Sequence, residues 1–338
     1  MGTSWNTYDA NKMSSGAMYG KTLAALADKD PRIIGVTADL AKSTNIGLIT
    51  QDGKYPERLI NVGIAEQNLF GVAAGLAKVG YIPFASTFAV FAALRGGEFI
   101  RTDAAYQRLP VRIIATHGGL SFGAAGSTHH CIEDFAVMRA IPNMTVDIPA
   151  DAYETASAIK ACVDIEKIPG PFYLRVGRGM EPLLHNSEDD YEYVIGKAMT
   201  LKEGNDVTIM ACGIPTRDAL IAGEMLEEQG VSAQVINMHT LKPIDKEAII
   251  EAAVKTRRIV TVEEHNIIGG LGDAVAAVLA ESGKRCILTK VGIPDEFGKI
   301  GKPEDLYAEY KLSSQGIMET VMELMGKEIE EEDWSDED

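Results

Sequence analysis

The sequence predicts an α/β protein of two domains, each built on a mostly parallel sheet flanked by helices. Short buried strand patterns alternate with helical patterns along the chain. This alternation stops at a polar segment, residues 180–192, and then starts again. The length of 338 residues also suits two domains of ordinary size. We therefore expect a first domain over residues 1–185, a second over 186–325 and an acidic tail over 326–338.

The first domain begins with a helix and then alternates between strands and helices. Residues 14–29 have helical periodicity and end at Asp30-Pro31, a natural helix stop. Residues 65–79 are rich in Gly and Ala, which favours a helix packed closely against a neighbouring backbone. The other expected helices cover residues 88–106 and 152–165, and the expected strands cover 32–37, 58–62, 83–86, 111–116, 144–148 and 172–176.

The second domain is predicted to repeat this alternation on a smaller scale. Its expected strands cover residues 207–211, 233–237 and 258–262, and its expected helices cover 216–228, 245–255 and 271–281. The chain then closes with the acidic run EIEEEDWSDED. Such a run cannot bury its charge, so we expect the tail to be disordered.

Composition narrows the partners that the chain can have. The formal net charge is −17, from 49 acidic and 32 basic residues, so we expect no nucleic-acid partner. A small anionic substrate stays open, since a few Arg and His side chains can override the global field. The four cysteines form no CxxC pair, which favours reduced thiols over disulfides or a zinc site. The chain lacks an apolar run of membrane-spanning length and a signal-peptide pattern, so we expect no membrane contact and a cytoplasmic location.

Three chemically rich loops follow expected strands of the first domain, at residues 38–45, 117–130 and 177–180. In open α/β sheets, ligands bind beyond the carboxyl ends of the strands. The second domain has no comparable cluster of loops. The sequence therefore predicts that the functional site belongs to the first domain.

The residue types alone leave two interpretations for each candidate. Glu66, in GIAEQN near the start of the small-residue helix, is either an acid that stabilises the helix dipole or a carboxyl held in a dry interface to share a proton. Phe88 and Phe91 are either core aromatics or a pocket for a flat ring. His117 and His129 share the stretch HGGLSFGAAGSTHH, but no carboxylate or cysteine lies at ligand spacing, so we assign no metal ligand to this chain. We expect His130 to be a solvated loop residue.

Five ordered segments resemble the pyrimidine-binding domain of the transketolase family. The stretch VGIAEQNLFGVAAGLA, at residues 62–77, is similar to the signature of transketolases and deoxyxylulose-phosphate synthases. The second domain resembles the C-terminal domain of the same family. The chain as a whole resembles the C-terminal subunit of a split, two-subunit transketolase. The four further segments are residues 37–43 (TADLAKS), 86–91 (STFAVF), 115–117 (ATH) with 126–129 (GSTH), and 175–179 (RVGRG).

The resemblance implies that thiamine diphosphate is the cofactor. Glu66 stands where the family has the glutamate that hydrogen-bonds N1′ of the aminopyrimidine and so activates the thiazolium carbon. Phe88 and Phe91 stand at the aromatic positions of the aminopyrimidine pocket, with Phe91 stacking on the ring. Asp39 stands beside the place of the cationic thiazolium.

The resemblance also assigns the substrate contacts. His117 and His129 match histidines that contact substrate oxygens, which makes them catalytic candidates together with Glu66. Arg178 matches the strand end that binds the anionic end of the sugar, where the planar guanidinium can make bidentate contact. Ser43, in the segment that resembles the one near the thiazolium, can donate a hydrogen bond to the same anion.

Three positions depart from the family pattern. Gly16 replaces an arginine that holds the substrate phosphate, Ala125 replaces an aspartate that reads a sugar hydroxyl, and Leu94 replaces an aromatic at the edge of the pyrimidine pocket. The cofactor machinery is kept while part of the sugar-reading machinery is changed. We therefore expect an altered substrate, such as a ketose that carries a sulfonate or a different hydroxyl pattern.

The resemblance implies a partner subunit as well. The family holds Mg²⁺ and the diphosphate with a Gly-Asp-Gly motif followed by Asn, and this chain has no Gly-Asp-Gly. We therefore expect these ligands on an N-terminal transketolase subunit, in a heterotetramer with two copies of each chain. The expected activity is transfer of a two-carbon ketol unit from a ketose to an aldose.

Three alternatives stay open at this point. The chain could belong to an enzyme of the deoxyxylulose-phosphate synthase type that uses pyruvate, since GIAEQN occurs in that pattern too. It could be a non-catalytic subunit that has kept the fold, although a scaffold has no need of Glu66, Phe91, His117 and His129 together. The β subunit of a 2-oxo-acid dehydrogenase shares the two-domain layout, but its loops are less similar.

Overall fold

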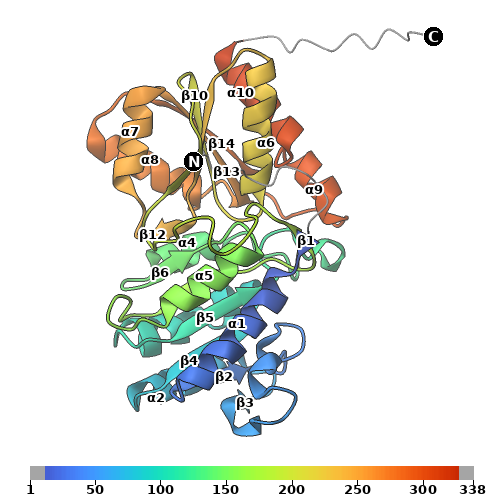
Figure 1. Ribbon diagram of the computed structural model, residues 1–338, viewed down its shortest axis with the longest axis vertical. Helices are drawn as coiled ribbons and strands as arrows, with labels where there is room; N and C mark the ends of the chain where they lie inside the picture. Colours follow the sequence, from blue (N-terminus) through green and yellow to red (C-terminus); the bar gives the residue numbers. More distant parts are fainter. Residues whose placement is uncertain (1–11, 327–338) are drawn as a thin grey trace, which may run out of the picture.

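The computed structural model describes residues 12–326 and contains two main sheets, each covered by helices on both faces (Figure 1). This is the α/β class that the sequence predicts. Within the described residues, no helix is long and apolar enough to cross a lipid bilayer. The tail that we expected to be disordered, residues 326–338, lies outside the described residues except for Gly326.

The larger sheet has seven strands within the described residues, in the order β12-β6-β7-β5-β4-β2-β3. All neighbouring strands in it are parallel except β12, which pairs antiparallel with β6. The bounds are β2 Ile33–Thr37, β3 Leu59–Asn61, β4 Ile82–Phe88, β5 Arg112–Thr116, β6 Thr145–Asp147, β7 Phe172–Arg175 and β12 Thr240–Lys242.

Helices cover both faces of the larger sheet. On one face α1 (Ser15–Lys29) packs against α5 (Ala152–Cys162), and both lie across the strands in Figure 1. The other face carries α2 (Glu66–Lys78), which packs on β4 and on the π-helical segment η4 (Ile100–Ala105). The remaining segments that follow strands of this sheet are η1 Ile46–Thr50, η2 Pro56–Arg58, η3 Phe91–Arg95, α3 Gly97–Phe99, η5 Gly123–Ala125 and α4 Asp134–Ala140.

Two helices of this layer begin at side-chain caps that the sequence supplies. The Ser14 hydroxyl accepts a hydrogen bond from the backbone N–H of Ala17, at 3.1 Å, at the start of α1. The Asp151 carboxylate accepts one from the N–H of Glu154, at 2.8 Å, at the start of α5. Such caps satisfy backbone donors that have no partner within the helix.

The smaller sheet has five strands within the described residues, in the order β14-β13-β10-β11-β9, and only β9 is antiparallel to its neighbour. Helices α6 and α10 pack together on one side of it, and α7 and α8 on the other (Figure 1). The strand bounds are β9 Met199–Lys202, β10 Val207–Ala211, β11 Ala233–Asn237, β13 Arg258–Asn266 and β14 Ile287–Ile293. The helix bounds are α6 Pro215–Glu228, α7 Lys246–Lys255, α8 Leu271–Ser282, α9 Pro303–Glu309 and α10 Ser314–Met325.

The segment at residues 180–192, where the predicted alternation of strands and helices stops, is partly buried. Its first residues form the short strand β8 (Glu181–Pro182), which pairs with β1 (Lys12–Met13). Leu184 and His185 are fully buried. Buried side chains in this segment fix the path of the chain between the sheets.

Candidate active site

The predicted site residues lie where parallel strands of the larger sheet end. Phe88 is the last residue of β4, and Asp39, His117 and Arg178 follow β2, β5 and β7. These four strands run parallel to one another, so their carboxyl ends meet at one edge. Asp39 and His117 have φ angles of 62° and 61°. Residues other than glycine seldom adopt this backbone region, and when they do they are often at functional sites.

An aromatic cluster occupies the middle of this edge. The Phe88 ring lies 4.1 Å from the His117 ring and 5.6 Å from the Phe91 ring, between centroids. The Phe91 ring in turn lies 5.6 Å from that of His129. The structure therefore brings together four predicted site residues that are up to 41 positions apart, from Phe88 to His129.

Phe122, which the motifs did not single out, completes the cluster. Its ring lies 4.8 Å from His117 and 5.2 Å from His129, both in edge-to-face geometry. The Arg178 guanidinium carbon lies 4.5 Å from the centroid of the same ring. Phe122 thus connects the predicted anion-binding residue to the two histidines. Its position in the stretch HGGLSFGAAGSTHH was the available signal.

His117 is buried and uncharged near neutral pH. Burial, and then the neighbouring Arg178 and His129, lower the pKa of His117 to about 4. Its Nδ1 lies 2.9 Å from the Thr116 hydroxyl oxygen, so that hydrogen bond orients the ring. The other ring nitrogen then remains available for a polar ligand atom, in a tautomer set by the bond to Thr116.

Glu66 is the first residue of α2 and its side chain is only 4% exposed. The Nη1 atom of Arg95 donates a hydrogen bond to its Oε1 atom, at 3.3 Å. The Arg95 guanidinium carbon also lies 4.0 Å from the centroid of the Phe91 ring. Arg95 is a second residue that the sequence motifs missed, and it connects the buried carboxylate to the aromatic cluster.

Asp39 and Ser43 are exposed in the loop that follows β2. Asp39 exchanges two hydrogen bonds with Asn61 at the end of β3, each at 3.0 Å, so Asn61 holds the Asp39 loop in place. Ser43 lies in an exposed turn, and within the described residues no hydrogen bond or ion pair joins its side chain to the other predicted residues. The structure therefore does not bring Ser43 into contact with Arg178.

The expectation that His130 is a solvated loop residue is wrong. Its side chain is buried, and its Nε2 atom lies 2.9 Å from the carbonyl oxygen of Gly123, to which it donates. This bond closes the loop that contains η5. No local sequence pattern indicates the bond, because the partner is a backbone carbonyl seven residues away.

The three departures from the family pattern have clear places in the structure. Leu94 is 55% exposed on the surface beside Arg95. Gly16 lies in the first turn of α1, where an added Cβ atom would lie 3.0 Å from the Asn45 Nδ2 atom. Ala125 ends η5. A larger residue at position 16 would thus require Asn45 to move.

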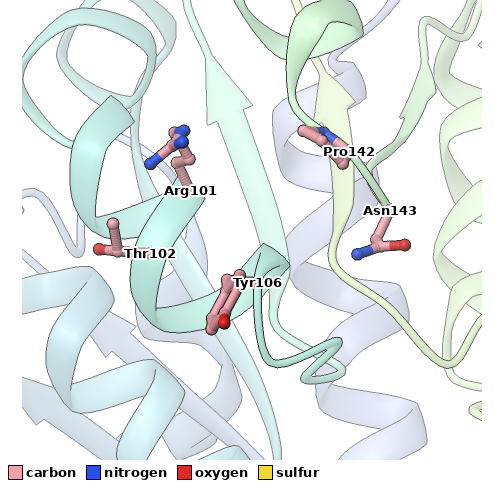
Figure 2. Close-up of a pocket in the computed structure, with 5 residues that line it drawn as sticks. All are labelled: Arg101, Thr102, Tyr106, Pro142 and Asn143. Atoms are coloured by element: carbon pink, nitrogen blue, oxygen red, sulfur yellow. The ribbon is translucent and has the colours of Figure 1, made fainter.

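A separate pocket lies away from the predicted site, beside the larger sheet. A pocket of roughly 460 Å³ lies between η4 and the turn before β6, lined by Arg101, Thr102, Tyr106, Pro142 and Asn143 (Figure 2). None of the predicted site residues lines it. Tyr106 and Asn143 come just before β5 and β6, so this pocket is at the edge where strands begin, away from the aromatic cluster.

Within residues 12–326, no group of three or more His, Cys, Asp or Glu side chains is placed to hold a metal ion. Three of the four cysteines are buried, the fourth, Cys286, is partly buried, and all four are free thiols. The polar groups described around the aromatic rings are a buried carboxylate, two histidines and two arginines.

Comparison with known proteins identifies two family models in the chain. The model for the transketolase pyrimidine binding domain matches residues 11–182, and the model for the transketolase C-terminal domain matches residues 196–317. The first match contains every predicted site residue.

Several full-length relatives are similar over nearly the whole chain. One of the subunits of the apulose-4-phosphate transketolase of Phocaeicola vulgatus is 39% identical, and the alignment covers 94% of this chain and 99% of the relative. The 6-deoxy-6-sulfo-D-fructose transketolase subunit SqwH of Clostridium sp. (strain MSTE9) is 38% identical, with 90% and 92% covered. A solved split gene transketolase, described as an inactive β4 tetramer, is 46% identical with a TM-score of 0.83, and 93% of this chain and 99% of that chain are covered.

Proposed function

Because the chain belongs to the transketolase family, with its nearly full-length relatives among the subunits of split transketolases, we propose that it supplies one half of a thiamine-diphosphate active site. In this proposal it is the subunit of a transferase that moves a two-carbon ketol unit between sugars. The division into a pyrimidine-binding domain over residues 1–185 and a C-terminal domain over 186–325 is part of the proposal.

The observation that carries the proposal is a buried carboxylate beside an aromatic cluster on an open surface. Glu66 lies at the start of α2 and pairs with Arg95, whose guanidinium also contacts the Phe91 ring. Two large apolar side chains beside Glu66 and Arg95 are exposed to solvent, Ile64 at 79% and Leu94 at 55%. Exposed apolar groups next to a polar site mark a surface that another molecule covers.

The chain's residues fit the aminopyrimidine part of the cofactor. A flat aromatic ring can stack on Phe91, and a ring nitrogen can hydrogen-bond the Glu66 carboxyl in a place with few competing waters. Asp39, at the next strand end, offers a negative charge for a cationic group. When bound, thiamine diphosphate supplies the electron sink for the transfer.

The remaining residues of the cluster act on the substrate. His117 and His129 hydrogen-bond substrate oxygens, and the low pKa of His117 keeps that side chain from adding a positive charge there. Arg178 holds the anionic end through its planar guanidinium. Ser43, exposed in the loop after β2, offers a hydroxyl donor for the same anion.

The other half of the site comes from a partner subunit in this proposal. The described residues offer no metal cluster, so we propose that the diphosphate and Mg²⁺ are held by an N-terminal transketolase subunit. An inactive tetramer of β chains in the solved relative supports the idea that such a chain needs its partner. The working assembly is then a heterotetramer with two of each subunit, in the cytoplasm.

The substrate is an anionic ketose, with phosphate or sulfonate at its end. Two relatives are named for apulose 4-phosphate and for 6-deoxy-6-sulfo-D-fructose. Both anions have three oxygens that Arg178 can bind. The Gly16 and Ala125 positions support a substrate that differs from the common ketose phosphates.

The test uses the purified chain with and without its partner subunit, in Mg²⁺ and thiamine diphosphate. Calorimetry measures cofactor binding, and turnover is measured on ketose phosphates, ketose sulfonates and pyruvate. We expect binding and ketol transfer only with the partner, and a loss of kcat of about 100-fold or more in Glu66→Gln. Glu57→Gln, an exposed carboxyl in η2, is the matched control and should leave kcat unchanged.

Other outcomes would favour the alternatives. Pyruvate consumption with release of CO₂ would indicate an enzyme of the deoxyxylulose-phosphate synthase type. A stable complex with the partner that binds no cofactor would indicate a subunit that has kept the fold without the chemistry. An active Glu66→Gln variant would contradict the role of Glu66.

A further inference from the structure

One guanidinium group contacts both residues that the aminopyrimidine would use. The Arg95 Nη1 atom lies 3.3 Å from the Glu66 Oε1 atom, and the Arg95 guanidinium carbon lies 4.0 Å from the Phe91 ring centroid. A guanidinium is planar, stacks on aromatic faces and donates hydrogen bonds in its own plane. It therefore makes the same two kinds of contact as a flat ring that bears a nitrogen.

The backbone that carries Arg95 is tightly packed, while its side chain is half-exposed. Phe91 and Arg95 begin and end the π-helical segment η3, and the N–H of Gly96 donates to the carbonyl of Phe91 at 3.0 Å. Gly96 packs so closely on Phe70 of α2 that an added Cβ would lie 2.2 Å from that ring. The Arg95 side chain, in contrast, is 50% exposed. The side chain can therefore swing toward solvent without any change in the backbone.

We infer that Arg95 is a gate over the aminopyrimidine half-site, an inference that rests on the proposed function. In the free subunit its guanidinium fills the space between Glu66 and Phe91 and neutralises a carboxylate that would otherwise be buried without a counter-charge. The cofactor ring and the guanidinium cannot occupy this space together. Binding of the cofactor therefore requires Arg95 to swing out, toward the surface that the partner subunit covers.

The gate is weak enough to open. A half-exposed ion pair and a half-exposed cation–π contact are both modest, so together they predict a competition of roughly three- to tenfold against cofactor binding. The gate thus keeps the half-site closed and charge-neutral until the partner and cofactor are present. It acts on cofactor binding, because Arg95 has left the site when the reaction takes place.

The test compares the assembled complex of the partner with wild-type chain, Arg95→Ala and Arg95→Lys. Calorimetry gives the Kd of thiamine diphosphate, and steady-state assays give kcat at saturating cofactor. We expect Kd to fall roughly three- to tenfold in Arg95→Ala while kcat stays within about twofold. Lysine keeps the charge but lacks the planar guanidinium, so the Kd of Arg95→Lys should lie between those of wild type and Arg95→Ala. Arg101→Ala is the matched control: an exposed arginine of η4, on the next turns of the same helical stretch, which should not change Kd.

The possible failures can be told apart. A wild-type complex that binds no thiamine diphosphate overturns the proposed function, and the gate with it. A wild-type complex that binds normally, with an unchanged Kd in Arg95→Ala, overturns the gate alone. A large loss of kcat at saturating cofactor in Arg95→Ala and Arg95→Lys would place Arg95 in the assembled catalytic site, and that also overturns the gate.

Discussion

Glu154, on helix α5 beside the larger sheet, accepts a hydrogen bond from Asn237 at the end of β11 in the smaller sheet. We predict that Glu154→Gln destabilises the whole chain. Its Oε1 atom accepts hydrogen bonds from His185 Nε2, at 2.7 Å, and from Asn237 Nδ2, at 2.6 Å. Its Oε2 atom accepts one from the N–H of Ala150, at 2.7 Å. Glutamine would bring an amide donor against at least one of these donors. It would also remove the nearest of the negative charges that face His185.

The magnitude follows from the complete burial of the pair. The side chains of Glu154 and His185 are both 0% exposed, so removing the Glu154 charge leaves buried donors without their anionic acceptor and leaves His185 with the longer 3.8 Å pair to Asp190. Breaking such a pair costs about 3 kcal/mol or more. Against a total stability of about 5–15 kcal/mol, this is a large fraction.

The effect has a defined pH dependence. Burial alone would lower the pKa of His185, but its hydrogen bond and charge contact with Glu154 outweigh burial and raise it. Burial alone would raise the pKa of Glu154, but the same partner outweighs burial and lowers it. The stability that His185 contributes is complete below its unfolded pKa of 6.5 and is lost as pH rises through its folded pKa. The stability that Glu154 contributes is complete above its unfolded pKa of 4.5 and is lost as pH falls through its folded pKa. The pair therefore stabilises most between pH 4.5 and 6.5.

The assay is urea unfolding of wild type and Glu154→Gln at several pH values from 5 to 8.5. We expect a difference of about 3 kcal/mol at pH 6 that becomes smaller toward pH 8.5, as His185 loses its proton. Glu247→Gln is the control, because its exposed carboxylate pairs with exposed Lys197 and its loss should cost less than about 1 kcal/mol. A difference below 1 kcal/mol at pH 6, or one that grows with pH, would refute the reasoning.

Two further predictions concern the site. Gly96→Ala should lower the free energy of unfolding by about 1–3 kcal/mol, because the added Cβ would lie 2.2 Å from the Phe70 ring. In Gly97→Ala the added Cβ meets nothing within 4 Å, so this control should leave stability unchanged. Thermal unfolding of both variants measures the difference. His117→Asn should make the chain less sensitive to acid. Since the pKa of folded His117 is about 4 against 6.5 unfolded, the unfolded state binds more protons between these values and wild type loses up to about 3 kcal/mol on acidification. Urea titrations at pH 7 and 4.5 measure this loss, and equal losses in both proteins would contradict the assignment.

Most strands and helices between residues 14 and 176 could be predicted because their signals are local, but the short helix α4 (Asp134–Ala140) was not expected. Each buried strand is a short apolar run, and α1 has both a capping serine and a stop at Asp30-Pro31. The helix expected after Phe88 is present, but η3 and η4 are π-helical, with one extra residue in a turn. No local pattern marks such a widening. Strand β12 was missed for another reason: it has three residues and its hydrogen bonds go to a strand almost a hundred positions earlier.

The candidate site shows the same limit. Glu66, Phe88, Phe91, His117 and His129 could be found because they stand in recognisable motifs, although their roles stay predictions. Arg95 and Asn61 stand in no such motif, and Phe122 lies in the stretch that contains His117 and His129 without being marked by it. Only the folded chain shows that these three residues touch the predicted ones. His130 was misjudged because its environment depends on how the loop closes over η5.

Strand β12 also bears on how this polypeptide can be divided. It comes from the part of the chain that otherwise forms the smaller sheet, but it pairs with β6 and is an edge strand of the larger sheet. A fragment cut between the sheets would leave the β6 edge with unpaired N–H and C=O groups, a template for uncontrolled pairing with other chains. The part of the chain that forms the smaller sheet thus also supplies one strand, β12, to the larger sheet. A redesign that exchanges one layer for that of a relative must carry residues Thr240–Lys242 with the larger sheet.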